Sequence, residues 1–116
     1  MSMIDELMPY GVDMVDAMER FADSVPLYEK LLKKIPDMVK SCEVMEYCKS
    51  GDYATALANA HTLKGTWGNM SIISLFQAYE QAVILFRANK PAEATAEIER
   101  ILPIQTEVVE IIEKYL

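Results

Sequence analysis

Apolar residues recur at intervals of three and four along most of the chain, which is the period of an amphipathic α-helix. Strand-like alternation is absent, and Met, Leu, Ala, Glu and Lys, which favour helices, dominate the composition. The pattern predicts helical segments over residues 2–8, 13–22, 24–47, 53–68, 71–88 and 91–116. The last four segments are substantial and joined by short turns. We therefore expect an all-α fold, an antiparallel four-helix bundle with short additional N-terminal helices.

Turn residues and prolines set the expected ends of these helices. One helix is expected to end and the next to begin at Ser50-Gly51-Asp52, and the same is expected at Asn89-Lys90-Pro91. Ser71 is expected to cap the helix that follows it. Pro36 lies inside the third segment and should bend or divide it, and Pro103 should kink the last one.

Length and charge limit what the chain can be. Its 116 residues predict one domain, 1–116, in which residues 1–10 form a flexible or short helical lead. The formal charge of −7 and the lack of a basic stripe argue against nucleic acid as a partner. Lys30, Lys33 and Lys34 cluster modestly, which we interpret as a solvated helix face rather than a patch that steers a partner.

No apolar run approaches the roughly 20 residues that span a bilayer, and the N-terminus lacks a secretory pattern. We expect a cytoplasmic protein with two reduced cysteines and no membrane contact.

The only histidine, His61, lies in the run Ala60-His61-Thr62-Leu63-Lys64-Gly65-Thr66-Trp67-Gly68. Helical spacing places Lys64, Gly65 and Gly68 beside it, with small residues one and two turns earlier. Each glycine inside a helix costs about 1 kcal/mol relative to alanine, so this pair suggests that something approaches the backbone closely. The opposite face should be core, which leaves His61 at the rim of that face and accessible. Its apolar positions are Ala56, Ala60, Leu63, Trp67 and Met70.

This arrangement suits a nucleophile that another protein must reach. A neutral imidazole nitrogen attacks activated phosphoryl groups, and the ammonium of Lys64 would balance the charge of the transferred group. Gly65 and Gly68 would give a bulky donor the clearance to close over His61. No strand with a Gly-rich phosphate loop is present, so ATP binding is not expected. We also expect no cofactor and no metal site on the chain.

Each of these residues can also be explained without a function. A lone histidine on a bundle is usually inert, and the glycines by themselves could mark tight helix packing or a helix end. Two rival functions remain open: an interaction module in which His61 is dispensable, and a small enzyme that uses His61 as a general base. The second rival needs a hydroxyl or carboxylate within hydrogen-bond reach of the ring, in a concave pocket.

The run His61-Thr62-Leu63-Lys64-Gly65 resembles the signature of histidine-containing phosphotransfer (HPt) domains, the four-helix-bundle carriers of multistep His–Asp phosphorelays. The block Asp13–Phe21 followed by Leu27–Leu32 also looks like the family's N-terminal pattern, and the positions of Leu75 and Glu80 match as well. The resemblance runs from about residue 11 to the end. It implies that His61 is phosphorylated on Nε2, that Lys64 contacts the phosphoryl group and that Gly65 leaves room for the receiver.

Three positions depart from the family's pattern. Ser71 stands where the family commonly has glycine, and Trp67 where it commonly has a small residue. Because Trp67 points to the expected core side, we expect altered packing and intact chemistry. Val83 occupies the position from which some members reach the phosphoryl site with a glutamine, which bears on how the phosphorylated state is stabilised.

The expected function is therefore that of a phosphocarrier in two-component signalling, with no kinase activity of its own. It would accept a phosphoryl group from a receiver-domain aspartate onto His61 and pass it to another receiver. The expected partners are receiver domains of response regulators, with the receiver of a hybrid sensor kinase as one candidate. The alternative is a non-phosphorylated helical adaptor that binds receiver domains.

Overall fold

The computed structural model describes residues 1–116, and the chain is all-helical with no strands. This confirms the expected all-α class. The elements are α1 (Met3–Leu7), the 3-10 turn η1 (Met8–Tyr10), α2 (Met14–Arg20), α3 (Val25–Leu32), α4 (Ile35–Ser41), α5 (Met45–Ser50), α6 (Tyr53–Asn69), α7 (Ile73–Arg87) and α8 (Pro91–Glu113). No helix is both long enough and apolar enough to cross a bilayer.

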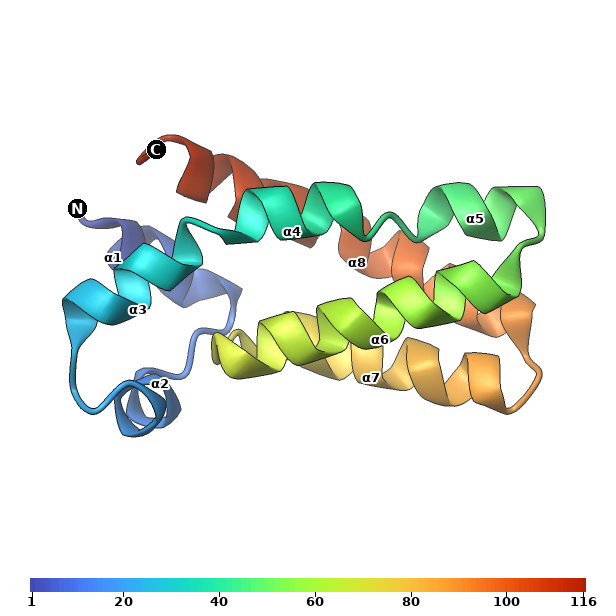
Figure 1. Ribbon diagram of the computed structural model, residues 1–116, viewed down its shortest axis with the longest axis horizontal. Helices are drawn as coiled ribbons and strands as arrows, with labels where there is room; N and C mark the ends of the chain where they lie inside the picture. The colour runs from blue at the N-terminus through green and yellow to red at the C-terminus, as the bar shows by residue number, and fades with distance from the viewer.

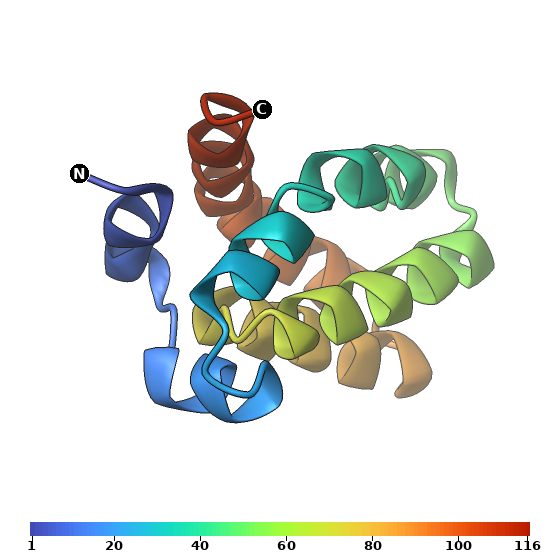
Figure 2. The same cartoon turned by 60° about the vertical axis from the view of Figure 1, so that its left-hand side comes forward.

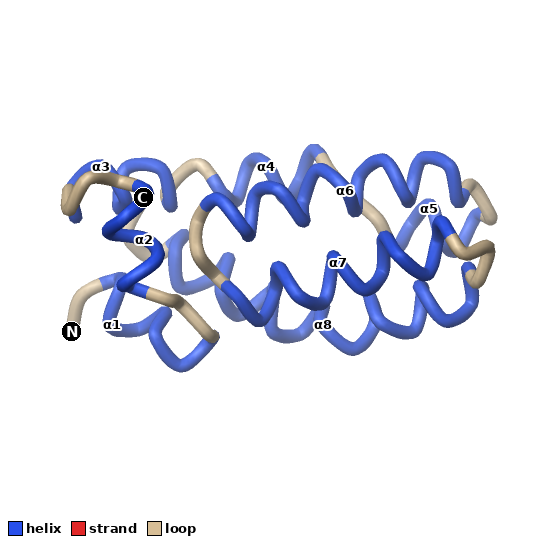
Figure 3. Tube along the Cα trace, turned by 90° about the horizontal axis from the view of Figure 1, so that it is seen from below, coloured by secondary structure: helices blue, strands red, loops and turns tan.

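The three long helices α6, α7 and α8 pack in sequence, each beside the next, along the 40 Å axis of the molecule (Figures 1 and 3). The short helices α4 and α5 follow one another along the same axis and contact both α6 and α8. The core lies between these elements. Its largest fully buried side chains include Trp67, Tyr28 and Tyr79.

The segment expected as one helix over residues 24–47 is divided into α3, α4 and α5. Pro36 lies in the first turn of α4, where a missing N–H costs nothing, and so it begins a helix instead of interrupting one. A second break separates Ser41 from Met45. The expectation that Pro36 bends or divides this segment is thus confirmed, while a further break at residues 42–44 was not expected. By contrast, α8 runs continuously through Pro103.

The N-terminal segment, residues 1–32, crosses one end of the long helices (Figure 2). Its connection to the turn between α6 and α7 is a set of backbone hydrogen bonds: Asp13 N–H donates to Ser71 O over 2.8 Å, and Ile73 N–H donates to Gly11 O over 2.9 Å. The Tyr28 hydroxyl adds a buried bond of 2.6 Å to Met70 O. The end of α6 is therefore held by residues far away in the sequence.

Residues 3–10 form α1 and η1, so most of the lead consists of short helices. Ser2 and Asp5 make a capping box at the start of α1. Helix α1 also packs on the C-terminal part of α8, where Glu6 accepts from Lys114 Nζ over 2.5 Å and from the Tyr115 hydroxyl. The two chain ends consequently lie at the same end of the molecule (Figure 1).

Ser71 does not cap α7 as expected. The residue before α7 is Ile72, and no side chain caps that helix. Ser71 instead lies at the end of α6 with φ +58°, in the left-handed region. Ser71 N–H donates to Gly68 O and Ile72 N–H to Trp67 O, both over 3.1 Å, which is the Schellman pattern of a helix C-terminus. Glycine is the usual residue at this position, because it carries no Cβ.

Candidate functional site

Helix α6 carries His61 at its middle. The helix begins after Asp52, whose carboxylate accepts from Thr55 N–H over 3.2 Å and so caps the first turn. It ends in the Schellman turn at Ser71. His61 therefore sits more than two turns from either end, where the backbone is fully hydrogen-bonded and does not fray.

The two faces of α6 differ as the apolar pattern predicted. The five positions expected to be core are all buried: Ala56, Ala60, Leu63, Trp67 and Met70. His61 is exposed, and so are Ala54, Ala58 and Gly65 on its own stripe. The accessibility that the sequence predicted for the imidazole is thus confirmed.

Lys64 follows His61 by three residues and is half-buried. The ion pairs of the molecule join Arg20 to Asp16, Arg100 to Glu97 and Lys114 to Glu6, so none of them involves Lys64. Its ammonium is therefore not engaged by a carboxylate of this chain. A free cation one helical turn from an exposed imidazole can attract an anionic group to that imidazole.

The two glycines of the run have different surroundings. A Cβ built on Gly65 meets nothing within 4 Å, so the surface beside His61 is open. A Cβ on Gly68 would lie 2.9 Å from Cδ1 of Phe76 on α7. Close packing of α6 on α7 is therefore sufficient to account for Gly68, and the clearance for an approaching partner is provided by Gly65.

No second catalytic group of this chain meets the imidazole. His61 makes no side-chain hydrogen bond and no ion pair, and it lines none of the four pockets of the surface. Nor do three or more potential metal-binding side chains come together anywhere in the chain. A base-activated nucleophile in a concave site, as in the general-base rival, is not assembled here.

The two other departures from the HPt pattern lie inside the protein. Trp67 is fully buried, which confirms its expected core position, and its indole N–H has no hydrogen-bond partner. Val83 on α7 is 1% exposed, so its side chain is part of the core and not of the surface around His61.

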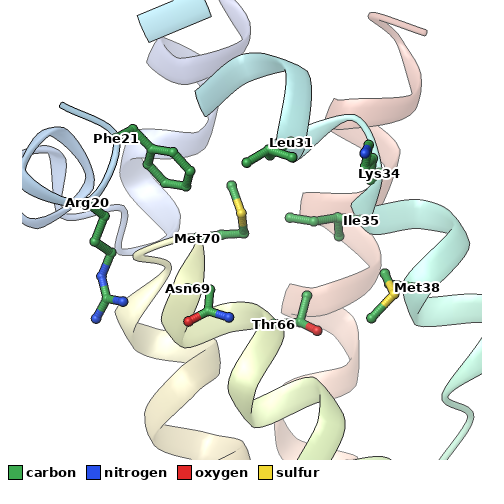
Figure 4. Close-up of a pocket in the computed structure, with 9 residues that line it drawn as sticks. All are labelled: Arg20, Phe21, Leu31, Lys34, Ile35, Met38, Thr66, Asn69 and Met70. Carbon is green, nitrogen blue, oxygen red and sulfur yellow. The ribbon is translucent and has the colours of Figure 1, made fainter. Parts of the chain in front are cut away.

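A groove lies beside the C-terminal half of α6, between this helix and the helices that precede it (Figure 4). It has a volume of about 540 Å³ and is lined by residues of α2, α3, α4 and α6 together with the adjoining turns. The residues are Arg20, Phe21, Leu31, Lys34, Ile35, Met38, Thr66, Asn69 and Met70. The sequence offered one sign of it, the lysine cluster at residues 30–34, but which of these lysines meets α6 depends on the tertiary structure.

Comparisons of the chain with protein-family models, with curated proteins and with solved structures return no match.

Proposed function

We propose that the chain is a histidine phosphotransfer carrier in two-component signalling. It takes a phosphoryl group from a receiver-domain aspartate onto His61 and passes it to another receiver. The observation that carries the proposal is the exposure of His61 on a rigid helix, one turn from the unpaired ammonium of Lys64 and the open surface at Gly65. These are the residues through which the chain resembles HPt domains.

The arrangement of the long helices supports the proposal. We assign α4 and α5 together as the first member, and α6, α7 and α8 as the other three members, of an antiparallel four-helix bundle. The first member is broken, and the N-terminal helices α1–α3 cover one end. Such a bundle presents one helix, α6, with a solvent-facing stripe that a partner can cover.

The proposed chemistry needs only the imidazole on this chain. Nε2 of His61 attacks phosphorus with its lone pair, and the bond between phosphorus and the aspartyl oxygen of the donor breaks. The receiver carboxylate leaves with that electron pair, and the proton on Nδ1 of the phosphoimidazolium can pass to water. Transfer to a second receiver is the reverse reaction, so the carrier needs neither nucleotide nor kinase activity.

Lys64 supports this chemistry through charge. The phosphoryl group carries negative charge on three oxygens, both in the transition state and after transfer. The ammonium of Lys64 lies on the next turn and can pair with one of them. We further propose that the partners are response-regulator receivers and that the protein acts in the cytoplasm, where such partners work.

A labelling experiment tests the proposal. The chain is incubated with receiver domains of the same genome that have been phosphorylated with acetyl phosphate, and separately with phosphoramidate as a partner-free donor. Label should appear on the chain and should be acid-labile and alkali-stable, as expected of phosphohistidine. Because His61 is the only histidine, the His61→Gln variant must lose all of it. Label that persists in His61→Gln contradicts the proposal.

In the adaptor alternative the chain keeps its fold and binds receivers, and His61 is dispensable. It predicts that receivers bind the chain without labelling it, and that His61→Gln binds them equally well. The general-base rival is disfavoured by the exposed, unpartnered imidazole, which no pocket encloses.

A further inference from the structure

A small concave site lies between α4 and α8, two helices that pack beside one another (Figure 1). We call it the α4–α8 cleft. Its volume is about 180 Å³, and a cavity of about 150 Å³ already accommodates a benzene ring. Five of its lining residues share one face of α8 and the sixth belongs to α4: Gln105, Thr106, Val109, Glu110, Glu113 and Val39.

Gln105 is a polar side chain in a buried position of this cleft, with 6% of its surface exposed. Its Oε1 accepts a hydrogen bond of 2.5 Å from the hydroxyl of Tyr79, a fully buried side chain on α7. The hydroxyl has no other acceptor, so reversing the amide would leave a buried O–H without a partner. The bond to Tyr79 therefore fixes which end of the amide faces the core.

The amide nitrogen of Gln105 is left without a partner in the protein. The side chain makes the bond to Tyr79 and no other. The sealed side-chain atom that lacks a partner is Nε1 of Trp67, so Nε2 of Gln105 keeps contact with solvent. The solvent-filled space that Gln105 lines is the α4–α8 cleft. Two free N–H donors in a nearly buried position favour an occupant that brings a hydrogen-bond acceptor.

The opposite end of the cleft is negatively charged. Glu110 and Glu113 are exposed, and neither takes part in an ion pair of the molecule. Two unpaired carboxylates on adjacent turns of a helix attract a cation. Residues 105 and 110 are about 8 Å apart along the helix axis, so the acceptor and the cation belong to opposite ends of one occupant.

A bare metal ion does not meet both demands. Hard cations bind oxygen ligands, whereas Gln105 presents N–H groups because its oxygen is used by Tyr79. Val39 and Val109 add apolar surface to the walls of the cleft. Such walls suit a carbon skeleton between the two polar ends.

We propose that the α4–α8 cleft binds a small organic cation that carries a hydroxyl or carbonyl oxygen at the end remote from its ammonium group. The oxygen accepts from Nε2 of Gln105, and the ammonium pairs with Glu110 and Glu113. The carbon skeleton packs on Val39 and Val109. The proposal does not depend on the phosphocarrier function, because no residue of α6 lines the cleft.

Three small molecules of similar size test this chemistry. Tyramine has an ammonium and a hydroxyl at opposite ends of a benzene ring, phenethylamine lacks the phenolic hydroxyl, and tyrosol has a neutral hydroxyl in place of the ammonium. Binding to the full chain is followed through backbone amide shifts. We expect tyramine to bind with a Kd of about 1 mM or tighter and to shift Gln105, Thr106 and Val109. Phenethylamine and tyrosol should each bind about three- to fivefold more weakly, because each lacks one of the two polar contacts.

Matched variants locate the two contacts. Glu110→Gln removes one carboxylate of the cleft at constant size and should weaken tyramine binding about threefold. Glu99→Gln makes the same change at an exposed position of α8 that lines no pocket, and should change binding by less than about 1.5-fold. Gln105→Met removes the N–H donors at similar length and should abolish the preference for tyramine over phenethylamine. If melting curves show that Gln105→Met does not fold, the comparison of ligands in the wild type and the two glutamate variants carry the test.

Several outcomes overturn the proposal. They are the absence of amide shifts at about 10 mM tyramine, equal binding of tyramine and either analogue, and equal effects of Glu110→Gln and Glu99→Gln. The last of these would attribute binding to the overall negative charge of the chain. Labelling of His61 by phosphoramidate should be the same in every folded variant. Tyramine binding without label therefore contradicts only the carrier, and label without tyramine binding contradicts only the cleft.

Discussion

Gly68 and Phe76 meet where α6 and α7 pack, and a side chain on Gly68 would overlap the phenylalanine ring. The ideal Cβ at residue 68 lies 2.9 Å from Cδ1 and 3.2 Å from Cε1 of Phe76. Gly65, three residues earlier on the same helix, has no such neighbour. Two glycines that look equivalent in the sequence therefore have different reasons to be there.

The first prediction separates these reasons by alanine substitution. Gly65→Ala should raise the free energy of unfolding by up to about 1 kcal/mol, because alanine is the better helix former and its methyl group enters open space. Gly68→Ala gains the same propensity but must displace the Phe76 ring, so we expect a net loss of about 1–2 kcal/mol. Urea denaturation of both variants measures the difference. Equal stabilities of the two variants would contradict this account.

Periodicity predicted the helices and the core face of α6 because both depend on local spacing. Ala60, Leu63 and Trp67 are three and four residues apart, and any partner element would bury the same stripe. The exposure of His61 followed from the same geometry. These features needed no knowledge of which element packs on α6.

The features that sequence reasoning missed depend on residues far apart in the chain. From the sequence alone, Ser71 could either cap α7 or follow the end of α6. The hydrogen bonds that residues 11–16 of the N-terminal segment make with Ser71 and its neighbours hold it in the second position. The lining of the groove likewise needs Phe21 and Leu31 to meet Met70, roughly 40–50 residues away along the chain. Periodicity within one helix contains no information about such pairs.

The second prediction concerns the left-handed backbone of Ser71. Its hydroxyl donates to Asp16 Oδ2 over 2.7 Å, in a part-buried position that ties the N-terminal segment to the end of α6. Ser71→Ala should lose this bond and about 1–2 kcal/mol of stability. Ser71→Gly loses the same bond but relieves the cost of a positive φ, so it should be about 1 kcal/mol more stable than Ser71→Ala. Thermal denaturation ranks the two variants, and the reverse order would refute the role given to the backbone.

The third prediction follows from the carboxylate that receives this bond. The hydrogen bond from Ser71, and after it the bond from Arg20, hold the pKa of Asp16 below its ordinary value of 3.8. A carboxyl with a lowered folded-state pKa stabilises the protein above its unfolded pKa, and this contribution is lost as the pH falls through the folded pKa. Asp16→Asn should therefore be less stable than the wild type at pH 7, and the gap should narrow below about pH 4. Melting temperatures measured across this range test the sign, and a gap that widens on acidification would contradict it.

The fourth prediction tests the open surface at Gly65. Gly65→Gln replaces a poor helix former with a good one and places a long side chain beside His61, where nothing from outside the helix lies within 4 Å of the new Cβ. The variant should fold normally and still be labelled by phosphoramidate. Transfer from a phosphorylated receiver should slow by about tenfold or more, because the receiver must approach the backbone at this position. Unchanged receiver transfer would show that the receiver does not approach the backbone closely at Gly65.

The last prediction tests whether the charge of Lys64 assists phosphoryl transfer to His61. Lys64 is half-buried and makes no ion pair, so Lys64→Ala should change the melting temperature little. The loss of one nearby cation should slow phosphoryl transfer from a receiver by about five- to tenfold, the effect expected of a partly solvated charge at close range. Lys64→Arg keeps the charge and should recover part of the rate, whereas Lys64→Gln, which keeps most of the length, should not. Transfer rates for the three variants are compared at low and high salt, since screening should shrink the difference between Arg and Gln. The opposite outcome is that Lys64→Ala lowers both the melting temperature and the transfer rate, and that Lys64→Arg restores neither. In that case Lys64 stabilises the helix packing and does not act on the phosphoryl group.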